Sequence, residues 1–176
     1  MGDMEALPYK ISTLVFLRDM DDRILLMERN KAPNRGLWSP IGGKLEMGTG
    51  ESPYEAAARE AGEEVGLTIE PGDLHLFSMI AEKNYEDRCH WLMFLFDCRK
   101  RLGTLPPPIG EGRFAFFREA EIPGLKLPET DRKALWKVYL EARSGFTALR
   151  ADCRSGRELI IEIEEQMGSD GWKAAP

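Results

Sequence analysis

The sequence predicts one domain of the α/β (α+β) class, in which a mixed β-sheet is flanked by two main helices. Short apolar and alternating runs typical of strands occur along most of the chain. Helical spacing of apolar residues is confined to two segments, one that begins after Ser52 and one over 129–143. A chain of 176 residues is long enough to build one core, and it contains no repeat or linker that would divide residues 1–176.

Four segments predict the centre of the sheet. Residues 9–19 and 23–30 read as a hairpin, because both are rich in β-forming residues and the turn sequence DMDD separates them. Residues 73–83 and 89–98 read as a second strand pair. Since 89–98 is apolar on both alternations, we expect it to be a central strand covered on both faces.

The other segments are less regular. Glycine and proline punctuate residues 31–44 and 103–112, which predicts loops. A short strand is expected at 113–119 and a closing hairpin at 145–165, which turns at RSGR. The ends, about 1–8 and 167–176, are expected to be flexible tails.

Composition limits the classes of partner. A net charge of −6 argues against a nucleic acid polymer, which requires a basic surface, but not against a single nucleotide whose charge a metal ion offsets. No apolar run approaches the roughly 18 residues of a membrane helix, so we expect a cytoplasmic protein that does not bind membranes. Cys89, Cys98 and Cys153 are widely spaced, which favours free thiols in a reducing compartment.

The start of the first helix is clearly defined by its sequence. Ser52 is a good N-cap, Pro53 suits the first helical position, and Glu55 completes a capping box. At about 100° per residue, four residues then share one apolar face. They are Tyr54, Ala58, Ala61 and Val65.

The same helix carries three crowded carboxylates. Glu60, Glu63 and Glu64 fall within an arc of about 100° on the side away from that apolar face. Like charges at this spacing repel, and they lie late in the helix, where the helix dipole disfavours anions. Either the arc is a solvated acidic surface or it binds a hard divalent cation. Helix composition alone does not separate these two interpretations.

A longer motif separates them. Its specified positions resemble the Nudix box, G-x5-E-x7-R-E-U-x-E-E-x-G-U, where U is an apolar residue. They are Gly43, Glu51, Arg59, Glu60, Glu63, Glu64, Gly66 and Leu67. Only the first interval departs, because seven residues instead of five separate Gly43 from Glu51.

The resemblance implies a Nudix-type α/β/α sandwich with a mixed sheet and a C-terminal β-hairpin. It also implies a metal-dependent hydrolase that splits the pyrophosphate linkage of a nucleoside diphosphate derivative, using two or three Mg²⁺ or Mn²⁺ ions. The implied metal-binding and catalytic set is Glu60, Glu63 and Glu64, joined by the carbonyl of Gly42. Glu60 is the favoured base. Gly43, Glu51, Arg59 and Gly66 are implied to be structural, and Arg59 is placed to pair with Glu51.

The two extra residues lie before the helix cap, so we expect the spacings inside the helix to be unchanged. Gly48 and Gly50 can adopt positive φ and thereby absorb the insertion. Gly42 should then still face the glutamates.

A broader similarity points to the hydrolases of oxidised purine nucleoside triphosphates. The segment EGRFAFF resembles one of their strands and makes Glu111 a candidate fourth metal ligand. The segment IPGLKLPETDRKALW resembles the one that supplies their base-reading acids, here Glu129 and Asp131, although these acids also suit a helix N-terminus. Ser39 and Leu127 depart from the base-contacting asparagine and tryptophan of the human-type enzyme.

Other candidates and alternatives stay open. Arg29, Arg35 and Lys44 are candidate phosphate-binding residues, and Trp38 is a candidate to stack on a base; an ordinary surface or core role is the alternative for each. Tyr85 lies near the position of a tyrosine in diadenosine polyphosphate hydrolases. A non-catalytic binding or regulatory module is the alternative of another class. The sequence does not indicate the oligomeric state.

Overall fold

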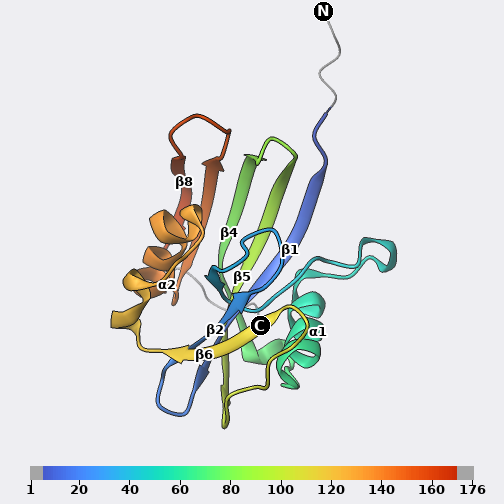
Figure 1. Ribbon diagram of the computed structural model, residues 1–176, viewed down its shortest axis with the longest axis vertical. Coiled ribbons are helices and arrows are strands. Elements are labelled where there is room, and N and C mark those ends of the chain that lie inside the picture. The colour runs from blue at the N-terminus through green and yellow to red at the C-terminus, as the bar shows by residue number, and fades with distance from the viewer. Residues whose placement is uncertain (1–5, 170–176) are drawn as a thin grey trace, which may run out of the picture.

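The computed structural model describes residues 6–169, which form one mixed sheet with few helices (Figure 1). Most of the two predicted tails, residues 1–5 and 170–176, lies outside the described residues. The strands are β1 (Tyr9–Asp19), β2 (Ile24–Arg29), β3 (Trp38–Ser39), β4 (Leu74–Tyr85), β5 (Cys89–Leu102), β6 (Gly112–Phe117), β7 (Phe146–Asp152) and β8 (Ile160–Met167). The α-helices are α1 (Pro53–Val65) and α2 (Trp136–Ala142). Shorter helical turns are η1 (Met47–Thr49), η2 (Pro71–Asp73), η3 (Glu119–Gly124) and η4 (Asp131–Leu135).

The sheet order is β3-β2-β1-β5-β4-β7-β8, and β6 pairs with β2. Both predicted hairpins at the centre are confirmed, since β1 pairs with β2 and β4 with β5 in antiparallel fashion. The pairs β1–β5 and β4–β7 are parallel, so the sheet is mixed as predicted. The strand β5 occupies the central position expected from its apolar residues on both alternations.

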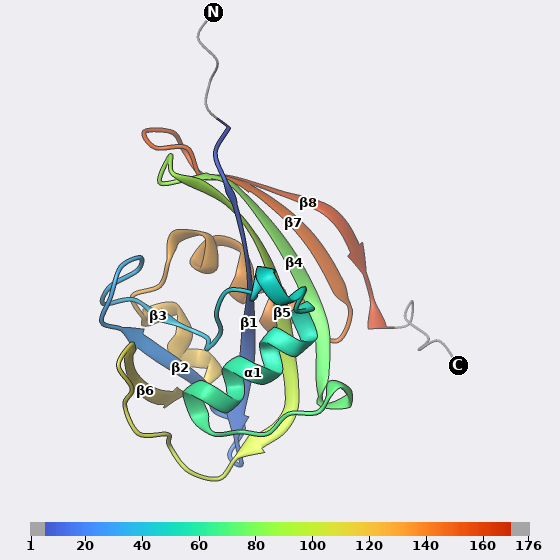
Figure 2. The ribbon, with the colours of Figure 1, turned by 90° about the vertical axis from the view of Figure 1, so that its right-hand side faces the viewer.

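Two apolar clusters cover the two faces of the sheet, with α1 and α2 on opposite sides (Figures 1 and 2). On the α2 side, Phe16, Leu95 and Tyr139 belong to one cluster. On the α1 side, Val15 and Phe96 belong to the other. Neighbouring residues of β1 and of β5 thus point to opposite clusters, as the period of a strand requires.

The helix α1 begins and ends as its sequence predicts. The Ser52 side chain accepts a hydrogen bond from the Glu55 amide, and the Glu55 carboxylate accepts one from the Ser52 amide. Gly66 ends the helix in the left-handed conformation, at φ 68°. The predicted apolar face is confirmed, because Tyr54, Ala58, Ala61 and Val65 all pack in the α1-side cluster.

The second predicted helix, 129–143, is confirmed, although its beginning is irregular. Residues 131–135 form one π-helical segment, η4, before the regular α2. Leu135, Val138 and Tyr139 are buried, as their spacing predicts. The wider π turn places Asp131 in the interior, where 7% of its surface is exposed.

Smaller differences from the sequence prediction follow from tertiary pairing. The strand β3 forms inside the predicted loop 31–44, because Met27 and Glu28 of β2 offer it a free edge. The strand β5 runs four residues beyond its predicted end, alongside β1. Cys89, Cys98 and Cys153 are free thiols, as predicted. None of the helices in the described chain is long and apolar enough to cross a membrane.

Candidate active site

The site is built where α1 meets the segment that follows β3. Residues 41–44 run beside β1, and the Thr13 amide donates to the Gly43 carbonyl at 2.9 Å. A Cβ at Gly42 would lie 2.0 Å from the Thr13 carbonyl oxygen, and one at Gly43 would lie 2.2 Å from Oε1 of Glu60. Only glycine therefore lets the backbone approach both β1 and the helix this closely.

Of the three glutamates, Glu64 is buried against this segment and Glu60 is half-buried beside it. Glu64 is 8% exposed, and its Oε2 accepts a hydrogen bond from the Gly42 amide at 3.0 Å. The side chain of Glu60 is 13% exposed, whereas that of Glu63 is 60% exposed. The interpretation of the arc as a solvated acidic surface is thus wrong for Glu64, which is buried, while Glu60 is half-buried beside the Gly43 backbone. The adjacency of Gly42 to the glutamates is confirmed for Glu64.

Arg59 ties these parts together, and its predicted pairing with Glu51 is present. Its Nε and one terminal nitrogen bind the two oxygens of Glu51 at 2.7 and 3.0 Å. It also donates to the Lys44 carbonyl at 3.0 Å and to Glu60 at 2.8 Å. A bidentate ion pair of this kind fixes orientation as well as adding energy. Arg59 therefore anchors the loop 44–51 to the helix that carries the glutamates.

The carboxylates disfavour one another's charge. The pKa of Glu64 is raised to about 7, chiefly by burial and also by the charges of Glu60 and Glu111, which together outweigh the hydrogen bond from Gly42 and the charge of Arg29. Burial also raises the pKa of Glu60, as do the charges of Glu63 and Glu111, although Arg59 opposes this. The cluster thus carries more negative charge than its protein surroundings offset.

Glu111 and Arg29 approach the cluster from other elements. Glu111 precedes β6, and its carbonyl accepts a hydrogen bond from the Asn30 amide at 2.9 Å. Its charge acts on both Glu60 and Glu64. Arg29, at the end of β2, is the cation that acts on Glu64. Both residues were candidates from the sequence, and the pairing of β2 with β6 brings them to the same place.

The candidates for substrate contact are more scattered. Trp38 packs edge-on against Phe117 and lies beneath Arg113, while Ser39 and Leu127 are buried. The side chain of Glu129 is 65% exposed and pairs with Lys133 at 2.9 Å. Lys44 and Arg35 are exposed. None of these positions by itself defines a base-binding residue.

Two residues near Asp131 were not candidates. Glu82 of β4 is 5% exposed, and its charge acts on Asp131. Asn34, in the loop before β3, accepts a hydrogen bond from the Tyr85 hydroxyl at 3.0 Å. No local pattern in the segment LHLFSMIAE marks its glutamate as a buried acid.

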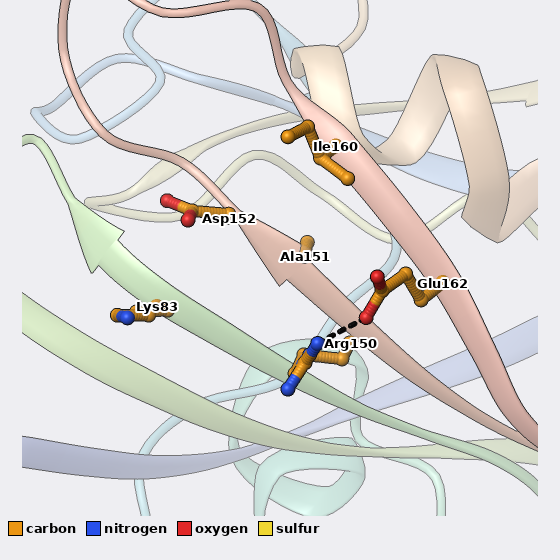
Figure 3. A pocket seen from close by; sticks show the side chains of 6 residues that line it. All are labelled: Lys83, Arg150, Ala151, Asp152, Ile160 and Glu162. Atoms are coloured by element: carbon orange, nitrogen blue, oxygen red, sulfur yellow. Dashed lines mark hydrogen bonds and ion pairs between the residues drawn. The ribbon is translucent and has the colours of Figure 1, made fainter.

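A separate hollow lies on the outer surface of β4, β7 and β8 (Figure 3). Lys83, Arg150, Asp152 and Glu162 are among the residues that line it. Arg150 pairs with Glu162, and Asp152 pairs with Arg154. Its two acids and its arginine are therefore already paired, and it contains none of the residues that the sequence nominated.

The donor set of the glutamate cluster fits a hard divalent cation. Carboxylate and carbonyl oxygens are the ligands that Mg²⁺ and Mn²⁺ prefer, and a cation would offset the mutual repulsion of the acids. Within residues 6–169, no three His, Cys, Asp or Glu side chains are already gathered around one point. Instead Arg59 holds Glu60, and the Gly42 amide holds Glu64.

In this protein a carboxylate-rich helix packs against a pair of glycines beside a mixed sheet. This combination of fold and site is typical of one class of hydrolase. The comparisons with known proteins agree. The family model described as the NUDIX domain matches residues 8–140. The chain therefore belongs to the Nudix family and is a Nudix hydrolase acting on phosphoanhydrides. Members of this family use divalent metal ions.

The chain is similar to several proteins of this family. It is 30% identical over 112 residues to the uncharacterized Nudix hydrolase YvcI of Bacillus subtilis, covering 63% of this chain and 68% of that protein. Its fold resembles that of MutT from Bacillus halodurans, with a TM-score of 0.72, 23% identity and coverage of 88% and 97% of the two chains. The NUDIX domain of Shewanella oneidensis NrtR, complexed with ADP ribose, gives 0.60, 16% identity and coverage of 78% and 89%.

Proposed function

We propose that this Nudix hydrolase cleaves a phosphoanhydride of a nucleoside triphosphate, of the oxidised purine type exemplified by 8-oxo-dGTP, to the monophosphate and pyrophosphate. The carrying observation is the close approach of Glu64 to Gly42 and of Glu60 to Gly43, with the charge of Glu111 acting on both glutamates. The MutT fold of the neighbours supports a nucleotide substrate, as does the ADP ribose bound to the NrtR domain.

In this proposal Glu60, Glu63, Glu64, Glu111 and the Gly42 carbonyl would hold Mg²⁺ or Mn²⁺, with two or three ions when substrate is bound. Such ions neutralise phosphate charge and lower the pKa of a bound water. Glu60 accepts the proton of the attacking water, and Arg59 keeps its carboxylate oriented through the 2.8 Å contact. Arg29, whose charge reaches Glu64, attracts the phosphates.

The first test is a panel of 8-oxo-dGTP, the ordinary dNTPs, diadenosine polyphosphates, ADP-ribose and NADH, each with Mg²⁺, with Mn²⁺ and with a chelator. Carrying out the reaction in ¹⁸O-labelled water shows which phosphorus is attacked. We expect metal-dependent release of pyrophosphate and a labelled monophosphate from 8-oxo-dGTP. Turnover of diadenosine polyphosphates alone would assign the alternative substrate class. No turnover of any compound would support a binding or regulatory module.

The second test is Glu63→Gln. Glu63 is exposed and makes only a 3.4 Å contact with Arg59, so the substitution should leave the fold intact. If Glu63 is a metal ligand, kcat should fall by at least about 100-fold. The control is Glu141→Gln, an exposed helical acid outside the site. A Glu63→Gln enzyme with near wild-type kcat would contradict the assignment.

A further inference from the structure

Arg29, at the end of β2, is held on one side by the loop that follows it. Its Nε donates to the Pro33 carbonyl at 3.1 Å. Its two terminal nitrogens have no hydrogen-bond or ion-pair partner among residues 6–169, although the charge of Arg29 acts on Glu64. The guanidinium is thus fixed at Nε and free at the two nitrogens that form a fork, and such a fork matches the oxygens of a phosphate group.

The loop itself is tied to the rest of the protein through Asn34. Asn34 is the only one of residues 30–35 that is not exposed, and it adopts φ 66° within a tight turn. In the described chain, one side-chain hydrogen bond joins this segment to a later element: the Tyr85 hydroxyl donates to Oδ1 of Asn34 at 3.0 Å. The position of the Pro33 carbonyl, and with it that of Arg29, therefore depends on Tyr85.

Tyr85 reaches the loop because β4 is irregular near its end. Glu82 pairs with Trp91 and Tyr85 pairs with Cys89, so β4 carries one extra residue between these two pairs. In a regular strand, residues three apart point to opposite faces. The bulge instead turns Tyr85 to the face of Glu82. This is the α2 side of the sheet, because Ile80 belongs to the α2-side cluster.

The turn around Tyr85 has an uncommon backbone conformation. Asn84, Glu86 and Asp87 have φ of 55°, 51° and 52°, in the left-handed region that side chains disfavour. Such outliers persist where the surrounding structure or the function requires them. The pKa of Tyr85 is raised to about 12, chiefly by burial and also by the charges of nearby acids. Its hydroxyl therefore keeps the proton that it donates to Asn34.

We infer that Tyr85 is a positioning residue for phosphate binding: through Asn34 it fixes the loop after β2, and the loop fixes Arg29. The hydroxyl acts without contact to the substrate. With the loop already ordered, the free nitrogens of Arg29 bind a phosphate group without an added entropic cost. This inference rests on the proposed function, in which Arg29 attracts the phosphates. It gives Tyr85 a role that is independent of the base.

The test is a double-mutant cycle of Tyr85→Phe and Arg29→Ala. Tyr85→Phe keeps the ring and removes only the hydroxyl; the control Tyr9→Phe does the same at a tyrosine of β1 that is 63% exposed. The ligand is the magnesium complex of inorganic triphosphate, which has no base, and isothermal titration calorimetry measures its binding without turnover. We expect Tyr85→Phe to weaken binding about 3- to 10-fold when Arg29 is present. In the Arg29→Ala background the loss should be below about 2-fold.

A second variant tests the same hydrogen bond from its other end. Asn34→Gly removes the acceptor and tolerates the positive φ of this position. It should reproduce the loss seen in Tyr85→Phe, whereas Tyr9→Phe should bind triphosphate like wild type. With 8-oxo-dGTP as substrate, Tyr85→Phe and Asn34→Gly should raise KM by a similar factor and leave kcat within about 2-fold, because Arg29 binds phosphate in the ground state and the transition state alike.

Circular dichroism and thermal melting show whether each variant is folded, and one folded variant of the Tyr85–Asn34 pair is sufficient. An equal loss of affinity with and without Arg29 would show a general structural role and overturn the inference, as would unchanged affinity in Tyr85→Phe. If the coupling is present but wild-type protein hydrolyses no nucleotide, the proposed function fails and this inference stands. If nucleotides are hydrolysed and the two substitutions act additively, the inference alone fails. If wild-type protein neither binds triphosphate nor hydrolyses a nucleotide, both fail.

Discussion

At the residue scale, the site depends on how closely a backbone can approach a carboxylate. Gly43 lies beneath Glu60 with no room for a methyl group, because a Cβ there would be 2.2 Å from Oε1. Glu60 cannot retreat freely, since Arg59 holds the same oxygen at 2.8 Å. The absence of a side chain at Gly43 therefore sets the position of Glu60.

This leads to a prediction for Gly43→Ala. The added methyl group should push the Glu60 carboxylate off its position and lower kcat by at least about 10-fold, a loss of about 1.4 kcal/mol of transition-state stabilisation. The matched control is Gly48→Ala, because a Cβ at Gly48 would meet nothing within 4 Å. Steady-state kinetics with Mg²⁺ and thermal melting of both variants provide the measurement. Equal rates in the two variants would show that Glu60 needs no such fixed position.

At the element scale, the loop between Gly43 and α1 carries the two extra residues. It forms the turn η1 over Met47–Thr49, closed by the Gly50 amide donating to the Met47 carbonyl at 3.3 Å. Gly50 adopts φ 72°, as predicted, whereas Gly48 does not adopt positive φ. The contacts to α1 come from the two ends of the loop, where Arg59 binds the Lys44 carbonyl and Glu51.

Removal of Gly48 and Thr49 should therefore leave the enzyme nearly unchanged. We expect kcat/KM within about 2-fold of wild type and a slightly raised melting temperature, because a shorter loop costs less entropy to order. Comparison with the double substitution Gly48→Ala, Thr49→Ala separates loop length from residue identity. A loss of kcat/KM beyond about 10-fold in the deletion alone would assign the turn a role in the site.

The same element shows what could be predicted and what could not. The cap at Ser52 and the apolar face of α1 depend on residues within a few positions of one another, so the pattern predicted them correctly. The burial of Glu64 and the partial burial of Glu60 depend on residues 41–44, and the approach of Glu111 depends on β6 pairing with β2. Those contacts join distant parts of the chain. The resemblance to a known motif indicated that Gly42 and Glu111 lie near the glutamates, but nothing in the sequence indicated that Glu64 is buried. Glu82 was missed because no local pattern marks a buried acid within a strand.

At the scale of the whole molecule, buried polar networks join α2 to the sheet at two ends. At one end Arg18, 2% exposed, donates to the Tyr139 hydroxyl at 2.9 Å, and that hydroxyl donates to Asp97 at 3.0 Å. Glu119 also binds Arg18, at 2.8 Å, so this network contains its own counter-charges. At the other end, no counter-charge within residues 6–169 acts on Glu82 or Asp131. The two ends should therefore respond differently to pH.

The last prediction concerns that response. Burial and the charge of Glu82 together raise the pKa of Asp131 to about 8, whereas the unfolded chain should have the ordinary value near 3.8. Between these two values the folded protein holds a proton that the unfolded chain has lost. The stability that the neutral Asp131 carboxyl contributes is therefore fully present below the pKa of this group in the unfolded chain. As the pH rises, this contribution to the free energy of unfolding declines by at most about 1.4 kcal/mol per pH unit, until the pH exceeds the pKa of Asp131 in the folded protein.

Asp131→Asn should abolish this part of the decline, because an amide binds no proton in that range. Urea unfolding at pH 5.5, 6.5 and 7.5, alongside wild type and Glu141→Gln, measures the effect. The groups that face Asp131 are Glu82 and Tyr85 of β4, with Cys153 beyond β7 acting through Glu82. All three are acids without a cationic form, so none supplies a compensating positive charge, and burial raises the pKa of each. The stability of the variant relative to wild type should increase steadily with pH, and parallel curves would show that Asp131 is ionised in the folded protein.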